Sequence, residues 1–210
     1  MRRPTIDTAR LVVEPVVLAG EFEHELVHFD GGSQASVHGR GSLAESVLTG
    51  VDLSGATLHP LTMTDVLLEQ TELSNAVLRE VIVRRCEIVR CRAVGLRLDL
   101  RQVADLYVEG CRFDHATLRI TQVKGRVAFR ECTFRDATIF GELTDVVFLD
   151  CDFAGTEFDA VSAVDCDLRS SRLVGARGLL TLRGALISAD QAVSVADQLA
   201  AEAGLRITES

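Results

Sequence analysis

The chain has 210 residues, of which 47% are hydrophobic and 25% charged, so one domain with a sizeable core is expected. No apolar run approaches the roughly eighteen residues of a membrane-spanning helix, which argues against a membrane partner. The formal net charge is −9, and there is no Trp and only one Tyr, so direct nucleic-acid binding is not expected either.

Residues 1–42 lack a regular period and are predicted to form an N-terminal cap. Two arginines precede the apolar stretches 11–13 and 16–18, as in a secretory signal, but Asp7, Glu14 and Pro15 interrupt a region that should be continuous. A strand or strand pair that starts the fold is the preferred interpretation. Segment 20–42 is either an imperfect first coil or a separate cap, because a first coil would otherwise expose a sheet edge.

Between residues 43 and 187 an apolar residue returns at every fifth position. One period reads Val51-Asp52-Leu53-Ser54-Gly55, and the next is centred on Leu58. A helix repeats at 3.6 residues and a strand at 2, so neither element explains this period. A fixed period of this length is typical of a solenoid, whose units bury their apolar faces by stacking on their neighbours.

The pattern resembles that of the pentapeptide-repeat family, whose unit is a small residue, a polar residue, a central Leu or Phe, and two outward residues. The resemblance is carried by Ala56-Thr57-Leu58, Ala116-Thr117-Leu118, Cys132-Thr133-Phe134, Cys151-Asp152-Phe153 and Cys166-Asp167-Leu168. It covers roughly seventy per cent of the chain. It implies an all-β fold, a right-handed quadrilateral β-helix with four pentapeptides and twenty residues in each coil.

Central residues twenty positions apart should then stack in four columns, which we name after their first members. The Leu48 column continues with Leu68, Ile88, Val108, Phe129, Phe148 and Leu168; the Leu53 column with Leu73, Ala93, Phe113, Phe134, Phe153 and Leu173; the Leu58 column with Leu78, Leu98, Leu118, Ile139 and Phe158; and the Met63 column with Val83, Val103, Val123, Leu143, Ala163 and Leu182. All four are apolar. This order requires one extra residue between Val123 and Phe129, where Lys124-Gly125-Arg126 predicts a bulge, and one missing residue between Ile139 and Leu143.

Residues 188–210 predict a helix of about fifteen residues and a short tail. Ser188 and Gln191 form a capping-box pattern, and Gly204 followed by Leu205 stands where a helix would end. The segment 182–192 looks like the ending of many pentapeptide-repeat proteins of actinobacteria, in some of which the helix makes a two-fold dimer. That resemblance implies a homodimer through the apolar helix face, which consists of Ala192, Val195, Ala196, Leu199 and Ala203.

Each of the six cysteines lies two residues before a central position, where the family places a small inward side chain. They are Cys86, Cys91, Cys111, Cys132, Cys151 and Cys166. Free Cys packs as a small hydrophobe, and no CxxC pair suggests zinc. Reduced thiols suit a cytoplasmic protein. Because no nucleophile elbow, P-loop or dinucleotide fingerprint is present, we expect neither an enzyme nor a bound cofactor or metal.

Charge is distributed in bands along the predicted rod. Residues 43–78 carry five acids and no Lys or Arg, residues 79–101 carry seven arginines against three acids, and residues 127–176 carry ten acids against four arginines. The second acidic band suggests a partner-binding surface made of Asp145, Asp150, Asp152, Glu157, Asp159, Asp165 and Asp167.

Two functions from different classes fit these features. The first is a non-catalytic protein-interaction rod, a scaffold or regulator whose partner the sequence does not identify. The alternative follows from the resemblance: some family members imitate duplex DNA, bind DNA gyrase or topoisomerase IV, and confer quinolone resistance or toxin immunity. A cleft that neutralises phosphates would accept an acidic rod, but the arginine band opposes this interpretation.

Overall fold

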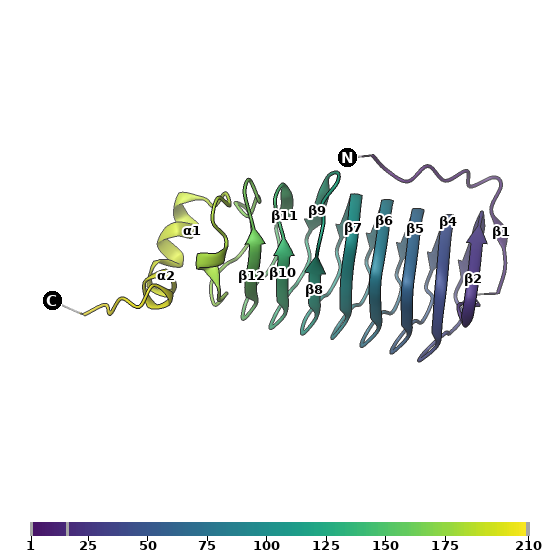
Figure 1. Cartoon of the computed structure of the whole chain (residues 1–210), viewed down its shortest axis with the longest axis horizontal. Helices are drawn as coiled ribbons and strands as arrows, with labels where there is room; N and C mark the ends of the chain where they lie inside the picture. Colours follow the sequence, from purple (N-terminus) through teal and green to yellow (C-terminus); the bar gives the residue numbers. More distant parts are fainter. Residues whose placement is uncertain (1, 16, 209–210) are drawn as a thin grey trace.

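The structure is a computed structural model that describes residues 2–15 and 17–208, and it shows a β-solenoid rod with short helices at its C-terminal end (Figure 1). Its elements in chain order are β1 (Val12–Val13), β2 (Gly20–Glu25), β3 (Val27–Asp30), β4 (His38–Thr49), β5 (Thr57–Glu69), β6 (Val77–Val89), β7 (Arg97–Glu109), β8 (Thr117–Ile120), β9 (Val127–Arg130), β10 (Thr138–Glu142), β11 (Val146–Leu149), β12 (Glu157–Ser162), the 3-10 helix η1 (Leu179–Thr181), α1 (Ala189–Ser194) and α2 (Ala196–Glu202). The predicted right-handed quadrilateral β-helix is confirmed, with about seven turns. No helix in the described ranges is both long and apolar enough to cross a membrane.

Strands of successive coils pair in parallel at the predicted step of twenty residues. Leu58 pairs with Leu78, which in turn pairs with Leu98. Every member of the four columns is buried except Val123 and Leu182, which are partly buried against the same core. The period of five therefore arises because each coil has four inward-facing central side chains. Each of them stacks on its equivalents in the coils before and after.

The chain can turn a corner every five residues because residues at the corners adopt the left-handed backbone conformation. Asp65 has φ 55°, Asn75 has φ 58° and Arg90 has φ 52°. Few side chains tolerate this region, and Asn and Asp do so more readily than most. The corner after the Met63 column carries Glu45, Asp65, Arg85, Asp105, Asp145 and Asp165, all with positive φ.

The β-helix begins before residue 43, because the segment from Gly20 already forms a coil. β2 and β3 both pair in parallel with β4, placing Phe22 opposite Gly41 and Phe29 opposite Leu48. A Cβ on Gly41 would lie 1.8 Å from the carbonyl oxygen of Phe22, so the close approach of the two coils requires glycine there. The apolar period is hidden in this segment because Gly39 takes the place of a large central residue.

Both predicted slips in register are present. Val108 pairs with Phe129 and Phe129 with Phe148, so one coil has one residue more than twenty and the next has one fewer. β5, β6 and β7 each run continuously over three columns, whereas the following coil is divided into β8 and β9 around residues 121–126. The extra residue therefore interrupts the strand over the Met63 column.

The second half of the core contains a ladder of stacked phenylalanine rings. Phe134 lies parallel to Phe113 and to Phe153, with ring centroids 5.1 and 5.3 Å apart. Phe129 and Phe148 form a parallel pair in the neighbouring column and meet Phe134 edge to face. Offset stacked and edge-to-face arrangements are the favourable ones for aromatic rings.

The predicted C-terminal helix of about fifteen residues is present, but a break divides it into two short helices, α1 and α2. The capping box is formed as predicted: the Gln191 N–H donates to Ser188 Oγ at 3.2 Å, and the Ser188 N–H donates to Gln191 Oε1 at 2.7 Å. The break falls at Val195, which leaves helical geometry with φ −110° and ψ 6° and is 1% exposed. A straight helix could not both seat Val195 in the end of the core and lay its second half across the last coil.

The helices also cover the open backbone edge of the last coil. Gln191 Nε2 donates to the carbonyl of Leu168 at 2.7 Å, and Gln198 Nε2 donates to that of Ala176 at 2.8 Å. Glu202 Oε2 accepts from the Leu180 N–H at 3.1 Å. These side chains provide partners for groups that a further coil would otherwise pair.

Replacing Phe134 by Ala should lower the free energy of unfolding by about 4 kcal/mol, because a fully buried ring is lost from the stack. Phe140→Ala is the matched control: its ring is half-buried on the outside under Arg119, 5.8 Å from the guanidinium carbon, and should cost less than about 1 kcal/mol. Urea unfolding of both variants measures the difference. Equal losses would show that the second half of the core does not depend on this ladder.

Candidate functional site

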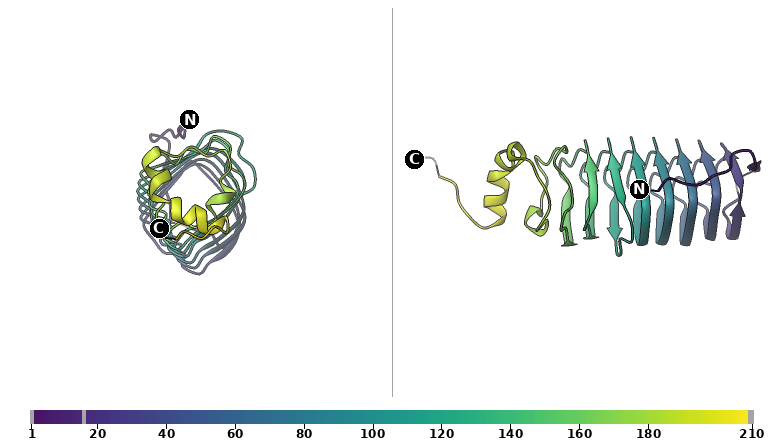
Figure 2. Two further views of the ribbon diagram at one scale, coloured as in Figure 1. Left: turned by 90° about the vertical axis from the view of Figure 1, so that its left-hand side faces the viewer. Right: turned by 90° about the horizontal axis from the view of Figure 1, so that it is seen from above.

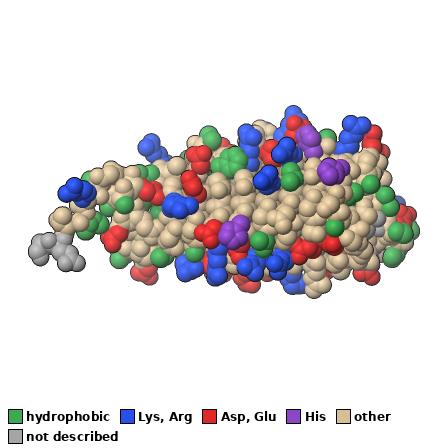
Figure 3. Space-filling model, turned by 90° about the horizontal axis from the view of Figure 1, so that it is seen from below, with side chains coloured by type: hydrophobic (Ala, Val, Ile, Leu, Met, Phe, Trp, Pro, Cys, Tyr) green, Lys and Arg blue, Asp and Glu red, His purple; other side chains and the backbone are tan. Residues whose placement is uncertain are grey.

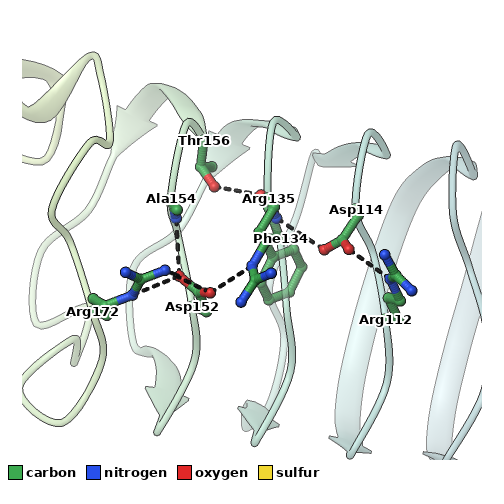
Figure 4. A network of polar contacts seen from close by, with 8 residues as sticks. All are labelled: Arg112, Asp114, Phe134, Arg135, Asp152, Ala154, Thr156 and Arg172. Atoms are coloured by element: carbon green, nitrogen blue, oxygen red, sulfur yellow. Dashed lines mark hydrogen bonds and ion pairs between the residues drawn. The ribbon is translucent and has the colours of Figure 1, made fainter.

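Asp152 from the predicted acidic surface lies between two arginines of neighbouring coils (Figure 4). Arg135 Nε is 2.7 Å from Asp152 Oδ2, and Arg172 Nη2 is 2.7 Å from Oδ1. Burial alone would raise the pKa of Asp152, but hydrogen bonds from both arginines and from the Ala154 N–H outweigh it and hold the pKa below its ordinary value. This carboxylate is ionised and its charge is neutralised locally.

Two more members of the predicted surface are paired with arginines, Asp167 within its own coil and Glu157 with the next coil. Arg169 Nη2 lies 2.8 Å from Asp167 Oδ2, and this contact lowers the pKa of Asp167. Arg177 lies 3.7 Å from Glu157. Such exposed pairs contribute little stability, but they reduce the negative potential that a partner would meet.

The remaining four acids are exposed and make no ion pair within 4.0 Å in the described part of the chain: Asp145, Asp150, Asp159 and Asp165. Asp145 and Asp165 stack at one corner, Asp150 stands at the corner across β11, and Asp159 lies on β12 opposite Phe140. The structure thus brings two of them together and distributes the others over different faces. We call these four residues the unpaired acids.

Arginines of the central band pair with acids of the coil before them. Arg85 pairs with Asp65, Arg90 with Glu69, and Arg92 with Glu72 at 3.6 Å. Each pair joins adjacent coils near the same corner or column, so two oppositely charged bands of the sequence neutralise each other in part. Figure 3 accordingly shows basic and acidic side chains intermixed along one side of the rod.

Four exposed arginines on β6 and β7 are not neutralised in this way. Arg79, Arg84, Arg97 and Arg101 make no ion pair within 4.0 Å in the described ranges. We call them the unpaired arginines. The structure therefore offers a second, basic surface on the middle coils. The twenty-residue register could have separated these arginines from Arg85 and Arg92, because the residue twenty positions before each of them is not acidic.

An N-terminal arm, residues 2–10, runs back along the outside of the rod (Figure 2). Its backbone N–H groups donate to carboxylates of separate coils: Thr5 to Asp65 Oδ1 at 2.9 Å and Arg2 to Asp105 Oδ1 at 3.0 Å. Between these points Arg3 Nε lies 3.5 Å from Glu87. Sequence reasoning missed this arm, since its contacts span up to 103 residues and carry no periodic signal.

The cysteines are buried and free, as their register predicts. Burial raises the pKa of the Cys86 thiol to about 12 and that of Cys166 to about 12. Cys91, Cys111, Cys132 and Cys151 stack in one column, where the Cys91 N–H donates to Cys111 Sγ at 3.3 Å. The raised pKa values of Cys86 and Cys166 keep these two thiols protonated. Among the described residues no group of three His, Cys, Asp or Glu side chains could hold a metal ion.

The predicted helix face is divided between capping and solvent. Val195 is buried and Leu199 half-buried against Leu173, Leu179 and Leu182 of the last coil. The other members of the face, Ala192, Ala196 and Ala203, are exposed. The two large side chains thus close the end of the rod, and the three alanines are left on the outer side.

Known structures resemble the whole rod. QnrB1, a plasmid-mediated fluoroquinolone resistance protein, matches in one trypsin-treated form with a TM-score of 0.54 and 19% identity over 95% of this chain and 100% of that chain. A second trypsin-treated form of QnrB1 has a TM-score of 0.50 and 17% identity over 91% and 99%. HetL, a pentapeptide-repeat protein involved in heterocyst differentiation regulation in a Nostoc cyanobacterium, has a TM-score of 0.41 and 14% identity over 80% and 84%. No protein-family model and no curated protein matches the sequence.

Replacing Asp65 by Asn should lower the free energy of unfolding by about 2 kcal/mol at pH 7, because a largely buried ion pair with Arg85 is lost. The hydrogen bond from Arg85, helped by the Thr5 N–H, holds the pKa of Asp65 below its ordinary value against the effect of burial. The stabilisation is therefore complete above about pH 4 and is lost as pH falls through the lowered pKa of the folded state.

Chemical unfolding between pH 2 and pH 7 measures this difference. Asp145→Asn is the matched control, because it changes an unpaired acid with the same left-handed backbone. A difference between D65N and wild type that does not shrink on acidification would contradict the role of the ion pair.

Proposed function

We propose that this chain, whose fold is the pentapeptide-repeat β-helix, acts as a non-catalytic protein-interaction rod in the cytoplasm. The observation that carries the proposal is the pairing of charges between coils, after which the unpaired arginines on β6 and β7 and the unpaired acids of the second half remain exposed on the rod, beside other single charges. A partner with a surface of mixed charge fits such a rod better than a uniform polyanion or polycation does. The fold itself is compatible with many partners.

The unpaired sets allow a direct test of this function. Three proteins serve as baits in a lysate of the source cells. The first is the full chain, the second has the four unpaired acids changed to Asn, and the third has four arginines changed to Gln: Arg79, Arg84, Arg97 and Arg101. We expect a stoichiometric partner that one variant loses and the other retains. Asn suits the acid positions because it tolerates the left-handed conformation at three of them. The proposal in this form would be refuted if no partner were captured, or if both variants retained the partner equally.

A second candidate function is DNA mimicry directed at DNA gyrase or topoisomerase IV. The likeness to QnrB1 in fold and the four unpaired acids favour it. Neutralisation of Asp152, Glu157 and Asp167 by arginines opposes it, because a mimic needs regular negative charge along the rod. The mimic would also be a two-fold dimer, which we propose would form through the exposed alanines Ala192, Ala196 and Ala203 of the helix face.

DNA supercoiling by gyrase, with the protein titrated in, tests this candidate. If the protein is a mimic, inhibition or drug protection should disappear when the unpaired acids become Asn. Either effect should persist in a control variant with the same number of acids neutralised at the other end of the rod, at the exposed residues Glu14, Glu23, Glu25 and Asp30. Sedimentation equilibrium should give twice the 22.8 kDa chain mass, falling to one chain in Ala196→Arg. No effect of the wild-type protein on either topoisomerase would exclude the mimic and leave the interaction rod.

A further inference from the structure

A groove of about 1190 Å³ opens on the rod between the coil that contains β8 and β9 and the coil that contains β10 and β11. One lip is residues 121–126, and the other is residues 142–145. Arg2, at the tip of the N-terminal arm, and Asp105 also line it, as do Val127, Ala128 and Val147. We call this the split groove.

The groove exists because hydrogen bonding between coils stops there. One coil earlier, the Val103 N–H donates to the carbonyl of Gln122 at 2.9 Å, and the Lys124 N–H donates to that of Val103 at 2.8 Å. One coil later, the Leu143 N–H donates to the carbonyl of Ser162 at 2.8 Å. Between the two lips themselves no hydrogen bond is formed, in a part of the chain that is described throughout.

The two register slips account for this opening. The extra residue lies within the first lip, and the missing residue lies at the start of the second. In the view along the rod axis one coil projects outside the outline of the others (Figure 2). The coils remain paired on either side of the groove, at Ile120 with Gly141 and at Val127 with Val146. The separation is thus local and has a definite length.

Backbone groups on both lips are left available. Val103 directs both its N–H and its C=O at the following coil, so by the same register Val123 directs both groups into the groove. On the opposite lip the carbonyl of Glu142 is the equivalent of the Gln122 carbonyl. The Thr144 N–H is bonded to Glu142 Oε1 at 2.9 Å. Unpaired strand groups of this kind accept an added strand.

Side chains around the split groove are charged in a fixed order. Lys124 and Arg126 stand on the first lip, and Glu142 and Asp145 stand on the second. When Arg2 and Asp105 are included, three cations and three acids line the groove. The lining therefore suits neither a polyanion nor a polycation. A segment lying between the lips would meet Gln122 and Glu142 at one outward position, and Lys124 and Thr144 two residues further on.

We propose that the split groove binds an extended peptide segment of a partner protein, parallel to the coils, with the pattern basic, small or apolar, acidic. This inference rests on the proposed interaction function and names its surface. The basic side chain faces Glu142 and the acidic one faces Lys124, about 4.8 Å away on each side as between neighbouring strands. The peptide main chain pairs with Val123 and with the Glu142 carbonyl.

A library of random heptapeptides displayed on phage, selected on the immobilised full chain, is the experimental probe. We expect enrichment of Lys or Arg followed two positions later by Asp or Glu. The double charge swap Lys124→Glu with Glu142→Lys should reverse the order of the enriched charges, with at least a tenfold change in preference for synthetic forms of the two peptides. The backbone amide of Val123 should become protected from hydrogen exchange on binding, whereas those of Thr121 and Lys124 are already bonded to the preceding coil.

A regularised variant, with Gly125 deleted and one Gly inserted after Gly141, is the control for the opening itself. It restores twenty residues to both coils, so it should close the split, keep the fold and lose peptide binding. Identical peptides enriched on wild type, swap and regularised proteins would overturn the groove while leaving the interaction rod intact. Enrichment of no peptide on wild type would also overturn the groove. Loss of the whole-protein partner from every bait would instead count against the proposed function.

Discussion

Hydrogen bonding between each coil and the next is the interaction on which this structure depends. It fixes a repeat of twenty residues, and that repeat in turn requires an apolar side chain at four inward positions and a left-handed residue at the corners. A ladder of this kind has two ends with unpaired backbone groups. At the C-terminal end Gln191, Gln198 and Glu202 bond those groups directly, while Val195 closes the core.

The same repeat governs where charges meet. Residues twenty positions apart become lateral neighbours about 4.8 Å apart. Acids of one stretch can therefore pair with arginines of the following stretch that lie one repeat later. This is what happens between Asp65 and Arg85 and between Glu72 and Arg92. Net charge in a sequence window is therefore a poor guide to surface potential in a solenoid. The acidic character expected of residues 127–176 is reduced for the same reason, because Arg172 lies one repeat from Asp152.

Features with a periodic or local signal could be predicted from sequence, and features that depend on contacts between distant parts of the chain could not. The four columns and the two slips follow from apolar spacing, and the capping box follows from Ser188 and Gln191. The break at Val195 depends on the shape of the rod end rather than on helical propensity, so the sequence predicted the C-terminal helix but not its division into α1 and α2. The N-terminal arm is held by backbone N–H groups donating to Asp65 and Asp105, and such contacts leave no pattern in the arm itself. The first coil was obscured where glycine replaces a central apolar residue.

The two slips also connect the fold to a possible site. Each slip is absorbed locally, because Phe129, Phe134 and Ile139, which lie between the two slips, remain buried in their columns. The columns also continue from Phe148 onwards, so the core is not affected beyond the coils that contain the slips. The slips do not preserve the ladder of backbone hydrogen bonds between residues 121–126 and residues 142–145. A solenoid built only for stacking needs neither slip, and the peptide site that we propose lies where the two slips face each other across the groove.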